Sequence, residues 1–127
     1  MNENKLKMAK KVELNNRVFD ERPWGNFEQF TLNEQTTVKI ISVKPNEKLS
    51  VQRHKHRDEF WKILDAPAKV TLDNESFILN KNEEVFIKKG QIHSIEGLDE
   101  PTRFIEIAFG KFDEQDIERL EDRYGRK

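Results

Sequence analysis

The sequence predicts an all-β domain, folded as an antiparallel sandwich or barrel. Short apolar or alternating runs of strand length recur from Trp24 onward, and turn-like segments rich in Asn, Asp, Gly and Pro separate them at close spacing. Repeated helical crossovers have no room between such runs. With 127 residues the chain can form one packed domain but not two of ordinary size, so a single pocket is expected.

The segment before the first run differs from the rest of the chain. Residues 1–16 are polar and lysine-rich without sustained apolar periodicity, which predicts a polar N-terminal arm outside the core. The domain itself is expected over residues 17–127. Its strands are predicted, in order, at residues 26–31, 37–43, 49–53, 59–64, 68–72, 76–79, 84–87, 93–95 and 103–109.

The tail is predicted to depart from this strand pattern. Residues 113–116 are mostly acidic, which suits a helix start, because negative charge interacts favourably with the helix dipole there. Apolar side chains then follow at helical spacing, namely Ile117, Leu120 and Tyr124. The sequence therefore predicts one short C-terminal helix packed on the β-domain.

Composition and charge argue against several classes of partner. Lysine plus arginine (23) nearly cancels aspartate plus glutamate (24), so no overall field favours nucleic acid, and no apolar run is long enough to span a membrane. The lysine-rich start lacks the apolar stretch of a secretory signal. Cysteine is absent, which excludes disulfide and thiolate chemistry, and a cytoplasmic location is expected.

The three histidines carry the strongest chemical signal. Because strand side chains alternate, Gln52, His54 and His56 should share one face that can look into the barrel. Glu59 can enter from the next strand, and His93 follows a glycine turn that leads into a later strand. The alternative is a solvated His-x-His pair on the surface, but the matching places of Glu59 and His93 favour convergence on a metal ion.

The donor types limit the metal without selecting it. Neutral imidazole nitrogens with a carboxylate and an amide oxygen suit Zn²⁺, Mn²⁺, Fe²⁺ or Ni²⁺, and no sulfur ligand is available. One divalent ion is expected.

The segments around these residues resemble a known family. In order and with compatible spacing, the resemblance is carried by Arg22-Pro-Trp-Gly25, Leu49-Ser-Val-Gln-Arg-His-Lys-His-Arg-Asp-Glu-Phe-Trp61, Ala68-Lys-Val-Thr71, Ile87-Lys-Lys-Gly-Gln-Ile-His93 and Asp116-Ile-Glu-Arg-Leu-Glu-Asp-Arg-Tyr-Gly-Arg126. They look like the type II mannose-6-phosphate isomerase cupin, the module that usually follows a mannose-1-phosphate guanylyltransferase domain. The resemblance implies a cupin-type antiparallel β-barrel, also called a double-stranded β-helix or jelly roll. A stand-alone module is expected, since these residues include no guanylyltransferase domain.

The resemblance also implies a ligand set. The cupin motif fits best with Gln52-x-His54 and four residues before Glu59, and a Gln, His, Glu, His set resembles the zinc site of phosphomannose isomerases. We therefore expect Gln52, His54, Glu59 and His93 to hold one metal ion, with zinc foremost and manganese, iron or nickel as alternatives. His56 would then face the same cavity as a supporting hydrogen-bond donor or proton-transfer group.

The implied reaction needs further groups. Interconversion of mannose 6-phosphate and fructose 6-phosphate requires a base, for which His56 and Glu106 are the candidates. The phosphate group requires cations, and Arg57, Lys89 and Arg103 lie near the motifs. The expected partner is a small-molecule sugar phosphate, and a homodimer is expected because related cupins often dimerise.

Departures from the family pattern leave the ligands in place but change turns and pocket lining. The chain has Lys88 and Gly97 where the family usually has proline and asparagine. It also has Phe60, Ala66 and Ala108 where histidine, glycine and glutamine are common.

Three function classes follow. The first is a metal-dependent sugar-phosphate isomerase, and the second is a non-catalytic sugar-binding, sugar-phosphate-binding or regulatory cupin. The third is a metal-dependent oxygenase, which the Arg-Pro-Trp-Gly start and Tyr-Gly-Arg end disfavour.

Overall fold

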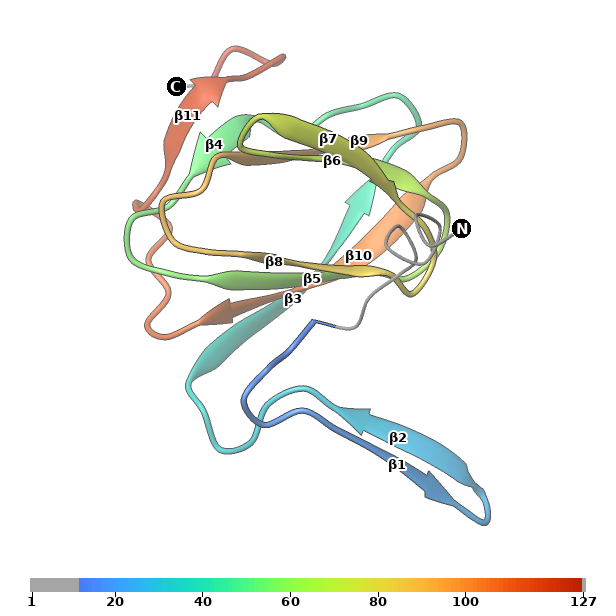
Figure 1. The fold of residues 1–127 in the computed structure, drawn as a ribbon. Coiled ribbons are helices and arrows are strands. Elements are labelled where there is room, and N and C mark those ends of the chain that lie inside the picture. Colours follow the sequence, from blue (N-terminus) through green and yellow to red (C-terminus); the bar gives the residue numbers. More distant parts are fainter. Residues whose placement is uncertain (1–11, 127) are drawn as a thin grey trace.

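A computed structural model describes residues 12–126 of the chain, which form an all-β fold (Figure 1). The strands are β1 (Val18–Arg22), β2 (Gly25–Gln29), β3 (Thr36–Val43), β4 (Val51–Arg53), β5 (Glu59–Ile63), β6 (Ala68–Leu72), β7 (Glu75–Leu79), β8 (Glu84–Ile87), β9 (His93–Gly97), β10 (Thr102–Phe109) and β11 (Glu118–Glu121). In this described range no helix is long and apolar enough to cross a membrane.

Two antiparallel sheets face each other to form the barrel (Figure 1). One has the strand order β3-β10-β5-β8, and the other has the order β11-β4-β9-β6-β7. The hairpin of β1 and β2 forms a separate two-stranded sheet that projects away from the barrel (Figure 1). The predicted cupin-type antiparallel barrel is confirmed.

The inner faces of the two sheets supply the core. Along β5 and β10, alternate side chains point inward, and the rings of Trp61 and Phe104 pack with centroids 4.8 Å apart. The apolar residues of this buried cluster are Val43, Trp61, Ile63, Ala68, Val70, Leu79, Val85, Ile87, Ile95 and Phe104. This apolar cluster fills only part of the interior. The buried residues at the start of β5 and β9 are polar, namely Glu59 and His93.

The outer face of β5 is also covered, which explains why every residue of this strand is buried. Phe60 packs against Phe30 with ring centroids 5.4 Å apart. Beside it, Glu84 forms ion pairs with Lys62 at 3.1 Å and with Arg17 at 2.6 Å. These contacts fasten the segment before β1 to the barrel.

Only the end of the predicted N-terminal arm belongs to the described part of the chain. Residues 1–11 lie outside the described residues, while residues 12–16 lead into β1. The backbone N–H of Val12 donates a 2.8 Å hydrogen bond to Glu84, so this part of the chain touches the barrel. The strand β1 was missed from sequence, because its apolar side chains, such as Phe19 at 57% exposure, face solvent and show no buried pattern.

The predicted C-terminal helix is wrong. Residues Glu118–Glu121 form β11, which pairs with β4 at Arg53 and Gln52. The apolar spacing that suggested a helix has no buried face behind it, since Leu120 is 40% and Tyr124 is 54% exposed. A short helix without tertiary packing is unstable, whereas the edge of β4 offers unpaired backbone groups.

Candidate metal centre

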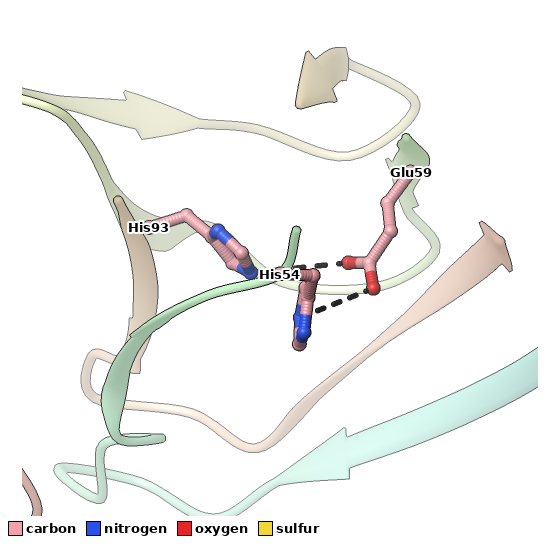
Figure 2. Close-up of side chains that lie close together, drawn as sticks. All are labelled: His54, Glu59 and His93. Carbon is pink, nitrogen blue, oxygen red and sulfur yellow. Dashed lines mark ion pairs between the residues drawn. The ribbon is translucent and has the colours of Figure 1, made fainter. Parts of the chain in front are cut away.

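Three of the predicted ligands meet inside the barrel. His54 follows β4, Glu59 begins β5 and His93 begins β9, so the two sheets each contribute to the group. Figure 2 shows both imidazole rings beside the Glu59 carboxylate. Their ligand atoms all lie within 4.8 Å of one another, and each residue is buried, with exposed fractions of 3% or less.

Both imidazoles are oriented by backbone carbonyls. Nδ1 of His54 lies 2.7 Å from the carbonyl oxygen of Asp116, and Nδ1 of His93 lies 2.9 Å from that of Gln91. Because a carbonyl only accepts, we assign the proton to Nδ1 in each ring. Nε2 is then left with its lone pair, and in His93 this buried atom has no hydrogen-bond partner among the described residues.

The charge states suit metal binding. Burial lowers the pKa of both His54 and His93, which favours the neutral imidazole that binds metals. Burial alone would raise the pKa of Glu59, but hydrogen bonding from Arg57 and the nearby histidines outweigh it, so the pKa is lowered and the carboxylate is favoured. Neutral nitrogens, a carboxylate and an orphaned buried Nε2 fit a divalent transition metal.

Gln52 lies beside this group. It is directly opposite His93 in the pairing of β4 with β9, and its side-chain Oε1 accepts a 2.9 Å hydrogen bond from Ser50. The residue is half-buried. Gln52 therefore lies next to His93 in the sheet, but its amide oxygen is already hydrogen-bonded to the Ser50 hydroxyl.

Arg57, which the sequence suggested as a phosphate ligand, contacts the Glu59 carboxylate directly. The side chain is buried, and Nε donates a 2.8 Å hydrogen bond to Oε2 of Glu59. Trp61 Nε1 donates to the other oxygen, Oε1, at 3.1 Å. A second guanidinium nitrogen, Nη2, lies 3.3 Å from Nε2 of His54. Glu59 is thus held at both oxygens.

Glu106, one of the two candidates for the base, also lies in the interior. It is directly opposite Trp61 on β5 and Lys39 on β3, so these side chains share the inner face. Burial, and then the neighbouring Glu59 carboxylate, raise the pKa of Glu106 to about 7. A carboxyl with a pKa of about 7 is present in both the protonated and the ionised form near neutral pH, so it can accept or release a proton.

The other predicted site residues lie elsewhere. His56 is exposed, because β4 ends at Arg53 and the alternation that predicted an inward His56 ends with it. Lys89 is exposed in the loop before β9. Arg103 lies on the outer face of β10 and pairs with Asp65 at 2.7 Å.

Three residues near the centre were not singled out from sequence. Asp116 holds the bend after β4 by accepting hydrogen bonds from the backbone N–H groups of Lys55 and His56 at 2.8 and 2.9 Å. Phe112 packs over Arg57, with the guanidinium carbon 4.4 Å from the ring centroid. Lys39 could have been found from the alternation along β3, whereas no local signal marks the other two.

The sequence matches the family model described as "Mannose-6-phosphate isomerase C-terminal" over residues 7–122. A mannose-1-phosphate guanylyltransferase of Salmonella typhimurium, ManC, is 42% identical over 107 residues, which are 83% of this chain and 22% of that protein. The alginate biosynthesis protein AlgA of Pseudomonas aeruginosa is 39% identical with the same coverage, 83% and 22%. The chain therefore spans about a fifth of these relatives.

A solved structure has the same fold. The protein is described as having a double-stranded β-helix domain, comes from Klebsiella pneumoniae, and aligns with a TM-score of 0.61 at 18% identity. The alignment covers 72% of this chain and 78% of that one. Fold, motif order and the match over most of its length show that the chain belongs to the family of mannose-6-phosphate isomerase C-terminal cupin domains.

Proposed function

We propose that this domain is a metal-dependent sugar-phosphate isomerase that interconverts mannose 6-phosphate and fructose 6-phosphate. The observation that carries the proposal is the buried His54, Glu59 and His93 group with a second buried carboxyl, Glu106, beside it. Family membership supports the same reaction. We also propose Zn²⁺ as the ion, held by these three side chains and by Gln52 after its amide turns from Ser50.

The reaction moves one proton between neighbouring carbons. A base takes the proton from C2 of the aldose, an enediol forms, and the proton is returned to C1 while another moves from the C2 oxygen to the C1 oxygen. We assign the base to Glu106, because its buried carboxyl shares the inner face of the barrel with the metal-ligand group. A bound metal ion would supply positive charge that favours the developing oxyanion.

Other residues position this machinery. Trp61 and Arg57 each donate to one oxygen of Glu59, which fixes the orientation of that carboxylate. The group is buried inside the barrel, where electrostatic interactions are stronger than in water.

A non-catalytic binding domain is the second candidate, and one observation favours it. Ala108 lies directly opposite Glu59 in the pairing of β10 with β5, where the family often has glutamine. An amide there would add a polar group beside the carboxylate, whereas this chain places only a methyl group at the position. Sugar binding without turnover would be the result if that amide were required.

One experiment separates the two candidates. Metal content is measured first, and the metal-loaded protein is then assayed for interconversion of mannose 6-phosphate and fructose 6-phosphate by a coupled reaction. Glu106→Gln is expected to keep its metal and lose turnover by about 10²- to 10⁴-fold. No turnover by the metal-loaded wild type, together with measurable sugar-phosphate binding, would establish the binding domain instead.

A further inference from the structure

Two cations approach one aromatic ring next to the candidate metal centre. Nζ of Lys39 lies 4.4 Å from the centroid of Phe112, and the guanidinium carbon of Arg57 also lies 4.4 Å from it. Lys39 comes from β3, while Phe112 belongs to the segment between β10 and β11. Two cations from different parts of the chain therefore lie around one aromatic ring.

Lys39 faces the centre rather than the outer surface of the sheet. It is directly opposite Glu106 in the pairing of β3 with β10, and opposite residues in a sheet share a face. Its charge acts to lower the pKa of Glu106, which also indicates that the two side chains are close. Lys39 is nevertheless exposed, so its ammonium group can be reached from solvent.

Among the described residues, no carboxylate forms an ion pair with Lys39, in contrast to Lys62 and Arg103, which pair with Glu84 and Asp65. Arg57 shares its charge with Glu59 and donates a 3.3 Å hydrogen bond to the carbonyl oxygen of Asp113. Lys39 is therefore the cation of the two without an ion-pair partner among the described residues, although the Glu106 carboxyl lies opposite it.

We infer that Lys39 and Arg57 form an anion site that takes the phosphate monoester of the substrate. The inference rests on the proposed function for the identity of the sugar, but the site itself follows from the cation geometry. The contact of the exposed Lys39 ammonium group with an aromatic ring is weak. Charge-assisted hydrogen bonds to a phosphate are stronger, so a phosphate can take the place of the Phe112 ring.

This assignment differs from the one that the sequence suggested. Lys89 and Arg103 were candidates by proximity to the motifs, yet Arg103 lies on the outer face of β10. Arg57 alone remains from that set, and Lys39 supplies the second cation. Together they lie on the side of Glu106, where a sugar held near the centre would present its distal phosphate.

The test compares sugars with and without phosphate. Binding of mannose 6-phosphate and of mannose is measured by calorimetry for the wild type, Lys39→Met and Lys39→Arg. Lys69→Met is the matched control, since Lys69 is exposed on β6 in the other sheet. Circular dichroism and metal content confirm that each variant is folded and loaded.

Lys39→Met is expected to bind mannose 6-phosphate about tenfold or more weakly, with mannose binding unchanged. Lys39→Arg should recover most of the affinity, and Lys69→Met should behave as wild type. In turnover, the loss should be in KM rather than in kcat. Unchanged affinity in Lys39→Met, or a wild type that binds both sugars equally, would overturn the anion site.

The two proposals fail in different ways. Turnover by the wild type with an unchanged KM in Lys39→Met would remove the anion site and leave the isomerase. Phosphate-dependent binding that requires Lys39, without any turnover, would remove the isomerase and leave the anion site.

Discussion

Nε of Arg57 donates a 2.8 Å hydrogen bond to Oε2 of Glu59, the carboxylate of the candidate metal centre. A guanidinium group and a metal ion are both cations, and both would use this carboxylate. Binding of a metal ion therefore competes with the hydrogen bond and is opposed by the charge of Arg57.

This competition predicts that Arg57→Gln binds Zn²⁺ more tightly than the wild type, by roughly three- to tenfold, because one opposing charge is removed. Competition with a chromophoric chelator would measure it. Arg53→Gln is the control, since Arg53 pairs with Glu118 at an exposed position outside the barrel. Weaker binding in Arg57→Gln would mean that Arg57 chiefly holds Glu59 in its binding orientation.

The second prediction separates the two neighbouring histidines. His54→Asn removes a buried imidazole and should lower metal affinity by more than about 100-fold, beyond the effect expected for an outer partner. His56→Asn changes an exposed side chain and should retain its metal. Both variants are compared by metal content and by turnover at saturating metal.

The turnover of His56→Asn then decides the role of that residue. A loss of about 10²- to 10⁴-fold with metal retained would support proton transfer by His56. Unchanged turnover would leave Glu106 as the base. Loss of metal as complete as in His54→Asn would refute the ligand set and place His56 in it.

The third prediction concerns the pH dependence of stability. Burial alone would raise the pKa of Glu84, but hydrogen bonds from Arg17, the Val12 backbone and Lys62 outweigh it, and the pKa is lowered. A carboxyl whose pKa is lower in the folded state stabilises the protein above its unfolded pKa, about 4.3, and loses this contribution as pH falls through the folded pKa.

Glu84→Gln should therefore reduce the free energy of unfolding by about 2 kcal/mol at pH 7, because Arg17 and Lys62 lose a buried charged partner and keep only Glu28, at 2.9 and 3.8 Å. The difference from wild type should shrink as the pH falls below about 4. Denaturant unfolding across this pH range measures it. Asp65→Asn, which removes an exposed partner of Arg103, should show little change at any pH. A Glu84 effect that is constant with pH would contradict the argument.

The fourth prediction concerns Gly97 on β9. A Cβ added there would lie 2.4 Å from the backbone carbonyl oxygen of Lys44, which is too close for any side chain. Replacing Gly97 with the asparagine common in the family should therefore lower the free energy of unfolding by roughly 1–3 kcal/mol. Lys69→Asn, at an exposed position on the neighbouring strand β6, is the control. Equal thermal stability of both variants would show that the Lys44 loop moves aside easily.

The sequence was sufficient for the class of fold and for the buried part of the site. Alternating runs and closely spaced turns predicted an antiparallel barrel. His54, Glu59 and His93 were expected to converge because alternation turned His54 inward, Glu59 could enter from the next strand and His93 followed a glycine turn. The same rule failed for His56. It assumes that a strand continues, but β4 ends at Arg53, and Asp116 binds the backbone of the bend that follows.

The remaining features depend on contacts between segments far apart in the chain. By itself, the sequence determined which donors are present, how they alternate and that the chain folds as strands, since these follow from local periodicity and residue chemistry. Only the tertiary structure decided that the tail pairs with β4 instead of forming a helix, that Arg57 lies on Glu59, and that Lys39 approaches Phe112. The physical reason is that burial and free strand edges are created by packing, and they override local preference wherever a segment buries little apolar surface of its own.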